Sequence, residues 1–156
     1  MIRFSTPHDL LESFRTANRR LVEMPDSIAF PFILRDYISW NDPSRRQTTV
    51  VFQTLLKSAP IAYGIVFKYA SGQTEAPVQM CQWCHSVRRG PAVDLLTIDV
   101  GPKRRIGLYL CRTLDCKEHL SQRVTGTSDL HETIPGDENI KRLLERMTEF
   151  AQRNLF

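Results

Sequence analysis

All four cysteines of this 156-residue chain fall into two tight pairs, and this pattern limits the possible folds more than any other feature of the sequence. The pairs are Cys81-Gln-Trp-Cys84 and Cys111-Arg-Thr-Leu-Asp-Cys116. Zinc(II) takes four thiolate or imidazole ligands in a tetrahedron, and a short spacing lets a single turn supply two of them. Two such pairs separated by about 25 residues are a strong signal for structural zinc. The sequence therefore predicts one zinc site with these four cysteines as ligands.

The residues around the pairs predict a small folded unit over residues 78–123. We expect Met80–His85 to form a knuckle whose backbone amides point at the thiolates. Cys111 should end a strand, and Cys116 should lie in the first turn of the next helix, where the helix dipole favours a thiolate. Knuckle, hairpin and helix in this order make a treble-clef zinc finger. Four protein ligands leave no open position for the water that a catalytic zinc needs.

Other interpretations of the cysteines remain beside structural zinc. Two disulfides are one, although the N-terminus has no secretory signal and so favours a reducing, cytoplasmic location. A thiol oxidoreductase using Cys81 and Cys84 is another, but that motif belongs at a strand-to-helix junction. His119 is a candidate to replace one cysteine as ligand or to hydrogen-bond a thiolate, and His85 directly follows the first pair.

The remaining segments predict a single α+β domain over residues 1–156, with an antiparallel sheet flanked by N- and C-terminal helices. Thr6 and Pro7 are a good helix start, and apolar residues at helical spacing extend the predicted helix to Val22. Residues 28–40 fit either a short helix or an extended piece. Strand-like runs follow at residues 48–52, 61–69, 93–100 and 105–110, the first two as an antiparallel hairpin.

The C-terminal segment predicts a helix over residues 137–153, because its apolar residues recur with helical periodicity. We expect one face of this helix to be buried against the sheet. That face carries Ile140, Leu144, Met147 and Ala151.

Composition and motifs favour a binding protein over an enzyme. The chain has no apolar run of about 20 residues to span a bilayer. It also has neither a Gly-rich phosphate-binding pattern nor a nucleophile paired with a histidine. The net charge of +4 suits an acidic partner. Lys103, Arg104 and Arg105 follow a predicted turn at Gly101-Pro102, and Trp83 lies inside the knuckle, so these four are the candidate partner-binding residues.

The cysteine block also resembles a known family. Cys81-Gln-Trp-Cys84-His85, followed by Gly107-Leu-Tyr-Leu-Cys111-x4-Cys116, resembles the C-terminal treble-clef zinc finger of elongation-factor-G-binding proteins, which include the fusidic-acid-resistance proteins. Upstream, Asp36-Tyr37-x-x-Trp40-x-Asp42-Pro43 is similar to the N-terminal part of the compact members. Two departures stand out: Ser39 stands where the compact members tend to have Gly, and Cys116 where the resistance proteins use a His.

The resemblance implies a protein that binds translation elongation factor G through its zinc domain and helps to release it from the ribosome, without catalysis of its own. The alternative is an RNA-binding zinc domain acting on ribosomal or other RNA. Such a domain uses basic residues for phosphate contacts, here Arg88-Arg89 and Lys103-Arg104-Arg105, and an aromatic side chain for base stacking, here Trp83.

Overall fold

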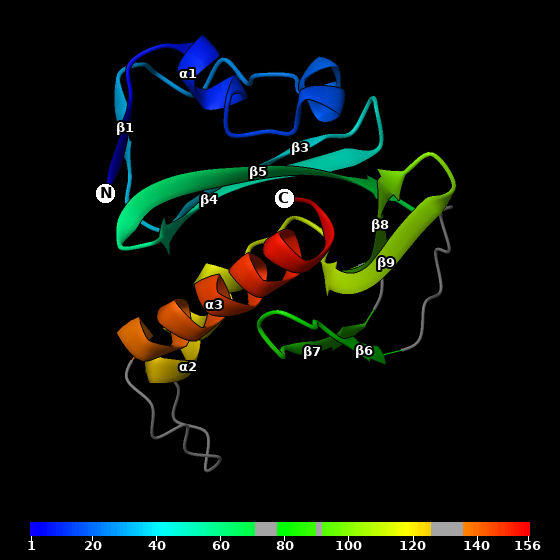
Figure 1. Cartoon of the computed structure of the whole chain (residues 1–156). Coiled ribbons are helices and arrows are strands. Elements are labelled where there is room, and N and C mark those ends of the chain that lie inside the picture. The colour runs from blue at the N-terminus through cyan, green and yellow to red at the C-terminus, as the bar shows by residue number, and fades with distance from the viewer. Residues whose placement is uncertain (71–77, 90–91, 126–135) are drawn as a thin grey trace.

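The computed structural model describes residues 1–70, 78–89, 92–125 and 136–156, with side chains for all of these except 121–125 and 136–137. Residues 90–91 of the predicted zinc finger lie outside the described residues. The predicted α+β fold is confirmed, since antiparallel strands form the centre and helices lie on either side of them (Figure 1). None of the described helices has the length and apolar character that a bilayer span requires.

A five-stranded antiparallel sheet in the order β3-β4-β5-β8-β9 forms the centre of the molecule. Its longest pairing is the predicted hairpin of β4 and β5, where β-branched and aromatic residues oppose one another, as Val50 does Ile65. The ambiguous segment 28–40 is extended, not helical. The strands of this sheet are β3 (Tyr37–Asp42), β4 (Gln47–Leu56), β5 (Ala59–Tyr69), β8 (Val93–Gly101) and β9 (Arg104–Cys111).

The sheet is weakly joined between β5 and β8. Only two residue pairs connect these strands, Lys68 with Thr97 and Tyr69 with Leu96. Figure 1 shows β8 and β9 turning away from the long β4–β5 hairpin. The sheet therefore consists of a three-stranded part and a β8–β9 hairpin that leads directly into the second cysteine pair.

The N-terminal segment covers one face of the sheet. Strand β1 (Ile2–Phe4) pairs with β2 (Phe32–Leu34), and the short helix α1 (Pro7–Leu11) follows β1. The predicted helix start is confirmed by a capping box. The Thr6 side chain accepts a hydrogen bond from the Asp9 N–H, and the Asp9 carboxylate accepts one from the Thr6 N–H.

The predicted single helix from Pro7 to Val22 is wrong. It ends after Leu11, and a separate 3-10 turn, η1 (Thr16–Leu21), follows. Between them the Gly64 N–H donates to the Ser13 carbonyl at 2.9 Å, and Phe14 forms a parallel bridge with Gly64. The Phe14 ring lies where a Cβ on Gly64 would be, 2.6 Å from its built position. This contact with the sheet outweighs local helical periodicity.

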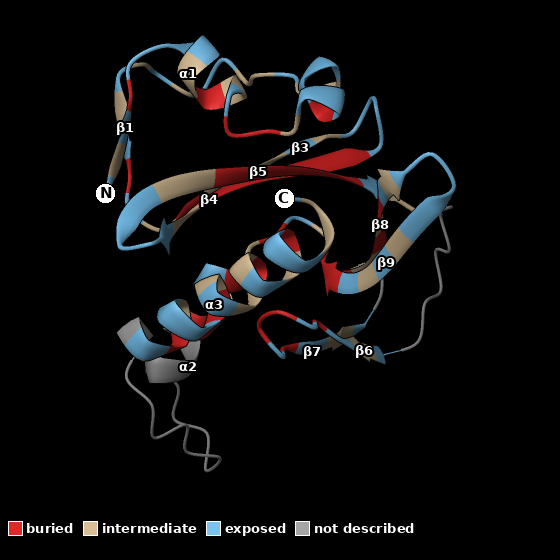
Figure 2. Cartoon of the chain, viewed as in Figure 1, coloured by how far each residue is buried: buried red, intermediate tan, exposed pale blue. Residues whose placement is uncertain are grey.

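Both faces of β4 and β5 are buried, so two hydrophobic cores lie on opposite sides of one hairpin (Figure 2). Alternate residues supply the two cores, Val51 and Val66 the smaller one and Val50 and Ile65 the larger one. The larger core also contains the four cysteines, Trp83 and the buried face of the C-terminal helix. The smaller core consists of Phe4, Leu10, Phe14, Leu34, Val51 and Val66.

The predicted C-terminal helix is present as α3 (Gly136–Asn154) and extends one residue beyond each predicted end. Met147 and Ala151 are fully buried, as expected, together with Leu143. Leu144 and Ile140 are only half-buried, because they lie at the edge of the helix next to a groove bordered by the β4–β5 hairpin. The expected burial of Leu144 is therefore only partial: it packs against the larger core from the edge of the helix, and Leu143 is the leucine that is fully buried.

Candidate metal centre

The first cysteine pair lies in the turn between two short antiparallel strands, β6 (Val78–Met80) and β7 (Val87–Arg89). The Cys81 N–H donates to the Ser86 carbonyl at 2.9 Å, and the His85 N–H donates to the Cys81 carbonyl at 2.8 Å. His85 has a φ of 63°, in the left-handed region, which lets the chain reverse within a few residues. The Cys84 N–H points at the Cys81 sulfur at 3.5 Å, so this turn is the predicted knuckle.

The second pair spans the end of β9 and the start of the next helix. Strand β9 ends at Cys111 and helix α2 (Cys116–Thr125) begins at Cys116, as the sequence predicts. Between them the Leu114 N–H donates to the Cys111 carbonyl at 2.8 Å, and Leu114 has a φ of 54°. Cys116 thus lies at a helix N-terminus, where the partial positive charge stabilises a thiolate.

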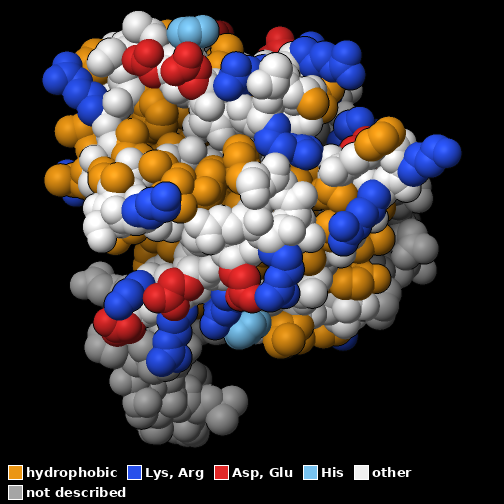
Figure 3. Space-filling view, viewed as in Figure 1, with side chains coloured by type: hydrophobic (Ala, Val, Ile, Leu, Met, Phe, Trp, Pro, Cys, Tyr) orange, Lys and Arg blue, Asp and Glu red, His pale blue; other side chains and the backbone are white. Residues whose placement is uncertain are grey.

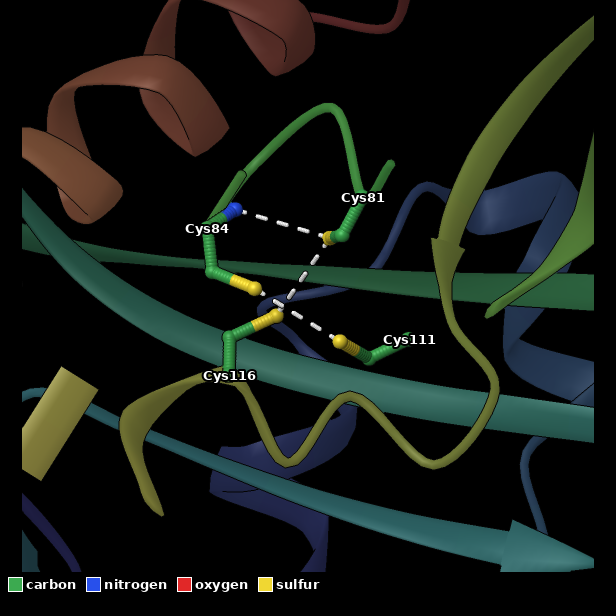
Figure 4. Close-up of side chains that lie close together, drawn as sticks. All are labelled: Cys81, Cys84, Cys111 and Cys116. Carbon is green, nitrogen blue, oxygen red and sulfur yellow. Dashed lines mark hydrogen bonds between the residues drawn. The ribbon is translucent and has the colours of Figure 1, made fainter. Parts of the chain in front are cut away.

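The four sulfur atoms converge between the two turns (Figure 4). The Cys81 sulfur lies 3.8 Å from that of Cys116, the Cys84 sulfur lies 3.6 Å from that of Cys111, and all four lie within 4.8 Å of one another. An S–S bond is about 2.05 Å long, so these separations exclude disulfides. Zn–S bonds of about 2.3 Å place tetrahedral sulfurs about 3.8 Å apart, which matches. None of the four cysteines forms a disulfide in the described structure, and all four are buried.

The protonation of the four thiols is strongly coupled. Hydrogen bonds from Cys111 and then Cys116 hold the pKa of Cys84 far below that of an ordinary thiol, and the same two neighbours lower the pKa of Cys81. The pKa of Cys116 is raised, first by its contact with Cys111 and then by those with Cys81 and Cys84. Four thiolates at this spacing repel one another, so all four ionise together only around a cation.

Zinc fits this site and is its cofactor. Four thiolates suit zinc's borderline-soft, tetrahedral character, and the sulfur separations match its bond lengths. Bound zinc would cross-link the β6–β7 turn to the β9–α2 turn. The Cys81-x2-Cys84 pair lies between two antiparallel strands, not at the strand-to-helix junction that a thioredoxin-like motif occupies.

His119 lies beside the four cysteines. Among the described residues, His85 belongs to no group of side chains that could hold a metal. The ligating atoms of His119, Asp115 and Cys111 lie within 4.8 Å of one another. The Asp115 carboxylate lies 3.1 Å from His119 Nε2 and 3.6 Å from the Arg88 guanidinium, which also contacts the His119 ring. This arrangement places His119 next to a ligand, as expected of a residue that supports the site from outside.

Trp83 is buried, with 3% of its surface exposed, so its expected exposure beside the basic residues is wrong. The indole packs edge-to-face against Phe67 and Phe150, at ring distances of 5.7 and 6.1 Å. Arg146 of α3 donates to the Trp83 carbonyl. A large aromatic inside the knuckle therefore joins the zinc finger to the larger core, and it offers no surface to a partner.

Lys103, Arg104 and Arg105 are exposed at the turn between β8 and β9, as the sequence predicts. Figure 3 shows Lys and Arg side chains projecting over this turn. Arg105 forms an ion pair with Asp99 across the hairpin at 2.8 Å, whereas no ion pair is found for Lys103 and Arg104 among the described residues. Their role in partner binding stays a prediction.

A further exposed surface escaped the sequence analysis. Val78, Met80 and Val87 are 52%, 50% and 62% exposed and lie on one face of the β6–β7 hairpin, where Met80 is directly opposite Val87. Arg89, opposite Val78, shares this face. We call these four residues the outer hairpin face. The alternation of Val78-Gln79-Met80 was a signal for it, but a three-residue strand is too short to show which side faces the solvent.

A comparison with known protein families agrees with this geometry. The sequence model of the FBP C-terminal treble-clef zinc-finger matches residues 9–153. No curated protein matches the sequence. Among solved structures, that of the fusidic acid resistance protein FusC is similar, with 15% identity and a TM-score of 0.46; the match covers 80% of this chain and 59% of the FusC chain. Since the family match covers nearly the whole chain, the protein belongs to the FBP C-terminal treble-clef zinc-finger family.

Proposed function

We propose that this chain is a binding protein without catalysis, whose zinc finger contacts translation elongation factor G and promotes its release from the ribosome. The partner is the one that the resemblance of the cysteine block implies. The observation that carries the proposal is the outer hairpin face, an apolar surface on the part of the finger that the metal would brace.

Three large apolar side chains together on a two-stranded hairpin are expensive to leave in water unless a partner covers them. Zinc bound to Cys81 and Cys84 would fix the turn that joins the two strands. A surface that is already rigid loses less conformational entropy on binding, so a structural metal beside a contact surface favours affinity.

The exposed cations of the chain suit an acidic protein. The β8–β9 turn carries Lys103, Arg104 and Arg105, and Arg89 lies on the outer hairpin face. The RNA-binding alternative assigned base stacking to Trp83, and this side chain is buried and cannot stack on a base. The structure therefore supports a protein partner more than an RNA.

Titration calorimetry with purified, nuclease-treated elongation factor G tests the proposal. The double variant Lys103→Glu, Arg105→Glu should bind at least tenfold more weakly, about 1.4 kcal/mol, with unchanged zinc content and only a small fall in melting temperature from the lost Arg105–Asp99 ion pair. Val87→Glu should weaken binding too, because it places a charge in the apolar contact. Cosedimentation of the factor with ribosomes, with and without this protein, tests release.

A matched control is the charge reversal of two exposed cations elsewhere, Arg20→Glu with Lys57→Glu, which makes the same change in net charge. This control should bind the factor like the unaltered protein. If the unaltered protein does not bind the factor but retains RNA in a mobility shift that salt abolishes, the RNA-binding alternative replaces the proposal.

A further inference from the structure

The hydroxyl of Tyr37 connects the edge of the sheet to the second cysteine turn. Tyr37 begins β3, and its side chain reaches the loop between β9 and α2 with only 8% of its surface exposed. The hydroxyl donates to the Leu114 carbonyl at 2.8 Å and accepts from the Lys117 N–H at 2.8 Å. One buried group thus satisfies one acceptor and one donor that lie on either side of Cys116.

The hydroxyl holds one backbone group at the start of α2 and one in the turn before it. The Lys117 N–H is one of the first amides of α2, which a helix leaves without an intrahelical acceptor. Leu114 is fully buried and has a left-handed backbone, so the chain around it relies on such fixed contacts. Without the hydroxyl, the part-buried Lys117 N–H and the buried Leu114 carbonyl would each lose a hydrogen bond, and the Leu114 carbonyl would keep the longer contact with the Ser39 hydroxyl at 3.4 Å.

Two neighbours of Tyr37 hold the same loop. The Ser39 hydroxyl donates to the Thr113 carbonyl at 3.1 Å, and Asp36 pairs with the Lys117 ammonium at 2.5 Å. Three residues within Asp36–Ser39 therefore contact the loop from Thr113 to Lys117. In the order of the sheet, β3 lies at the edge opposite β9, the strand that supplies Cys111.

We infer that Tyr37 is a positioning residue for the zinc ligand Cys116. By fixing the backbone at Leu114 and Lys117, it sets the direction in which the Cys116 sulfur points, toward the other three sulfurs (Figure 4). The two ligands of the second pair are thus placed from opposite edges of the sheet, Cys111 by β9 itself and Cys116 by β3. Zinc affinity then depends on strand β3, which contributes no ligand.

The test is Tyr37→Phe, which keeps the ring and removes the hydroxyl. Competition with a chromophoric chelator measures zinc affinity in the full chain. We expect a loss of about 10- to 100-fold, the usual effect of removing a hydrogen bond that orients a ligand. Cobalt(II) substituted for zinc adds a spectroscopic readout. The visible bands of the tetrahedral cobalt–thiolate site should shift in the variant, a change that a general loss of stability does not produce.

The matched control is Tyr63→Phe. Tyr63 is equally buried, at 8% exposed, and its ring packs against Phe52 and Phe156, away from the zinc turns. This variant should keep the zinc affinity and the cobalt spectrum of the unaltered protein. Ser39→Ala is a milder change to the same support and should lower zinc affinity less than Tyr37→Phe does.

The inference is overturned if Tyr37→Phe binds zinc as tightly as Tyr63→Phe and gives the same cobalt spectrum, whatever its melting temperature. If Tyr37→Phe proves too unstable to purify, Ser39→Ala decides alone. A reduced zinc affinity in that variant supports the inference, and an unchanged affinity overturns it.

Discussion

The two cores on either side of the β4–β5 hairpin are built on different principles. The smaller core is made of aromatic and aliphatic side chains alone, and a capped helix, a 3-10 turn and two short strands cover it. The larger core includes four cysteine thiols whose ionised forms repel one another. One side is therefore held by hydrophobic burial, and the other side depends on a metal as well.

This difference between the two cores indicates which part of the chain depends on zinc for its stability. Structural zinc contributes about 10–16 kcal/mol of apparent free energy in isolated zinc-finger peptides. The net stability of a whole domain is about 5–15 kcal/mol. The two turns that carry the cysteines have little regular structure. Without zinc, their buried residues therefore lose the cross-link that holds the two turns together. The β1–β2 side has no such dependence.

Loss of zinc should have the largest effect. Cys111→Ser, or removal of the metal by a chelator, should abolish the site and unfold at least the finger, because the remaining thiols cannot satisfy zinc's four positions. Elemental analysis should find about one zinc per unaltered chain. Hydrogen exchange of the metal-free protein should show residues 78–89 and 104–120 exchanging first. If amides of both cores exchange at the same time, the two cores unfold as one cooperative unit, and the dependence on zinc cannot be assigned to only one of them.

Phe14→Ala tests the smaller core. The ring is fully buried over Gly64, and its loss should lower the free energy of unfolding by about 3–5 kcal/mol. Denaturant unfolding measures this change, and the folded variant should still bind one zinc. A variant that loses zinc while still folded would show that the two cores are coupled through the shared hairpin.

Two adjacent leucines of α3 sharpen the description of the larger core. Leu143 is fully buried, and Leu143→Ala should cost about 2–5 kcal/mol of unfolding free energy. Leu144 is half-buried at the groove, so Leu144→Ala should cost only about 1 kcal/mol. Chemical denaturation of both variants gives the comparison directly. Equal costs would mean that a partner or a second chain covers the groove in solution.

The smallest effect concerns the cap of α1. Hydrogen bonds from the Thr6 and Ser5 backbone N–H groups lower the pKa of Asp9. Its contribution is therefore present above the ordinary carboxyl pKa of about 4 and is lost as the pH falls through the lower, folded value. The melting-temperature difference between the unaltered protein and Asp9→Asn should shrink in that acid window.

The cysteine spacing predicted the metal site well because its geometry is local. Each pair lies within one turn, and zinc's tetrahedron dictates how two turns meet, so ligands, knuckle and helix start all followed from the sequence. Trp83 shows the limit of the same reasoning. Its position in a knuckle indicated exposure, whereas contacts with Phe67 and Phe150, distant along the chain, bury it.

The prediction of a long N-terminal helix was wrong, and the contacts of Tyr37 were not predicted, for the same physical reason. The apolar residues from Leu10 to Val22 have helical spacing, but Phe14 gains more from the bare backbone of Gly64 than from another helical turn. From the sequence, Tyr37 is one aromatic residue in a segment that fits either a short helix or an extended piece. Its role depends on a hydroxyl meeting Leu114, 77 residues away, and no local pattern encodes that contact.

The packing of Phe14 on Gly64 has a consequence for how this sequence can vary. A methyl group at position 64 would overlap the aromatic ring, so every other amino acid there must first displace Phe14 from its site. Gly101, by contrast, has no atom within 4 Å of a built Cβ. In a saturation-mutagenesis library, position 101 should accept many residues. Position 64 should accept a larger residue only in clones where position 14 carries a smaller residue, so substitutions at the two positions should be coupled.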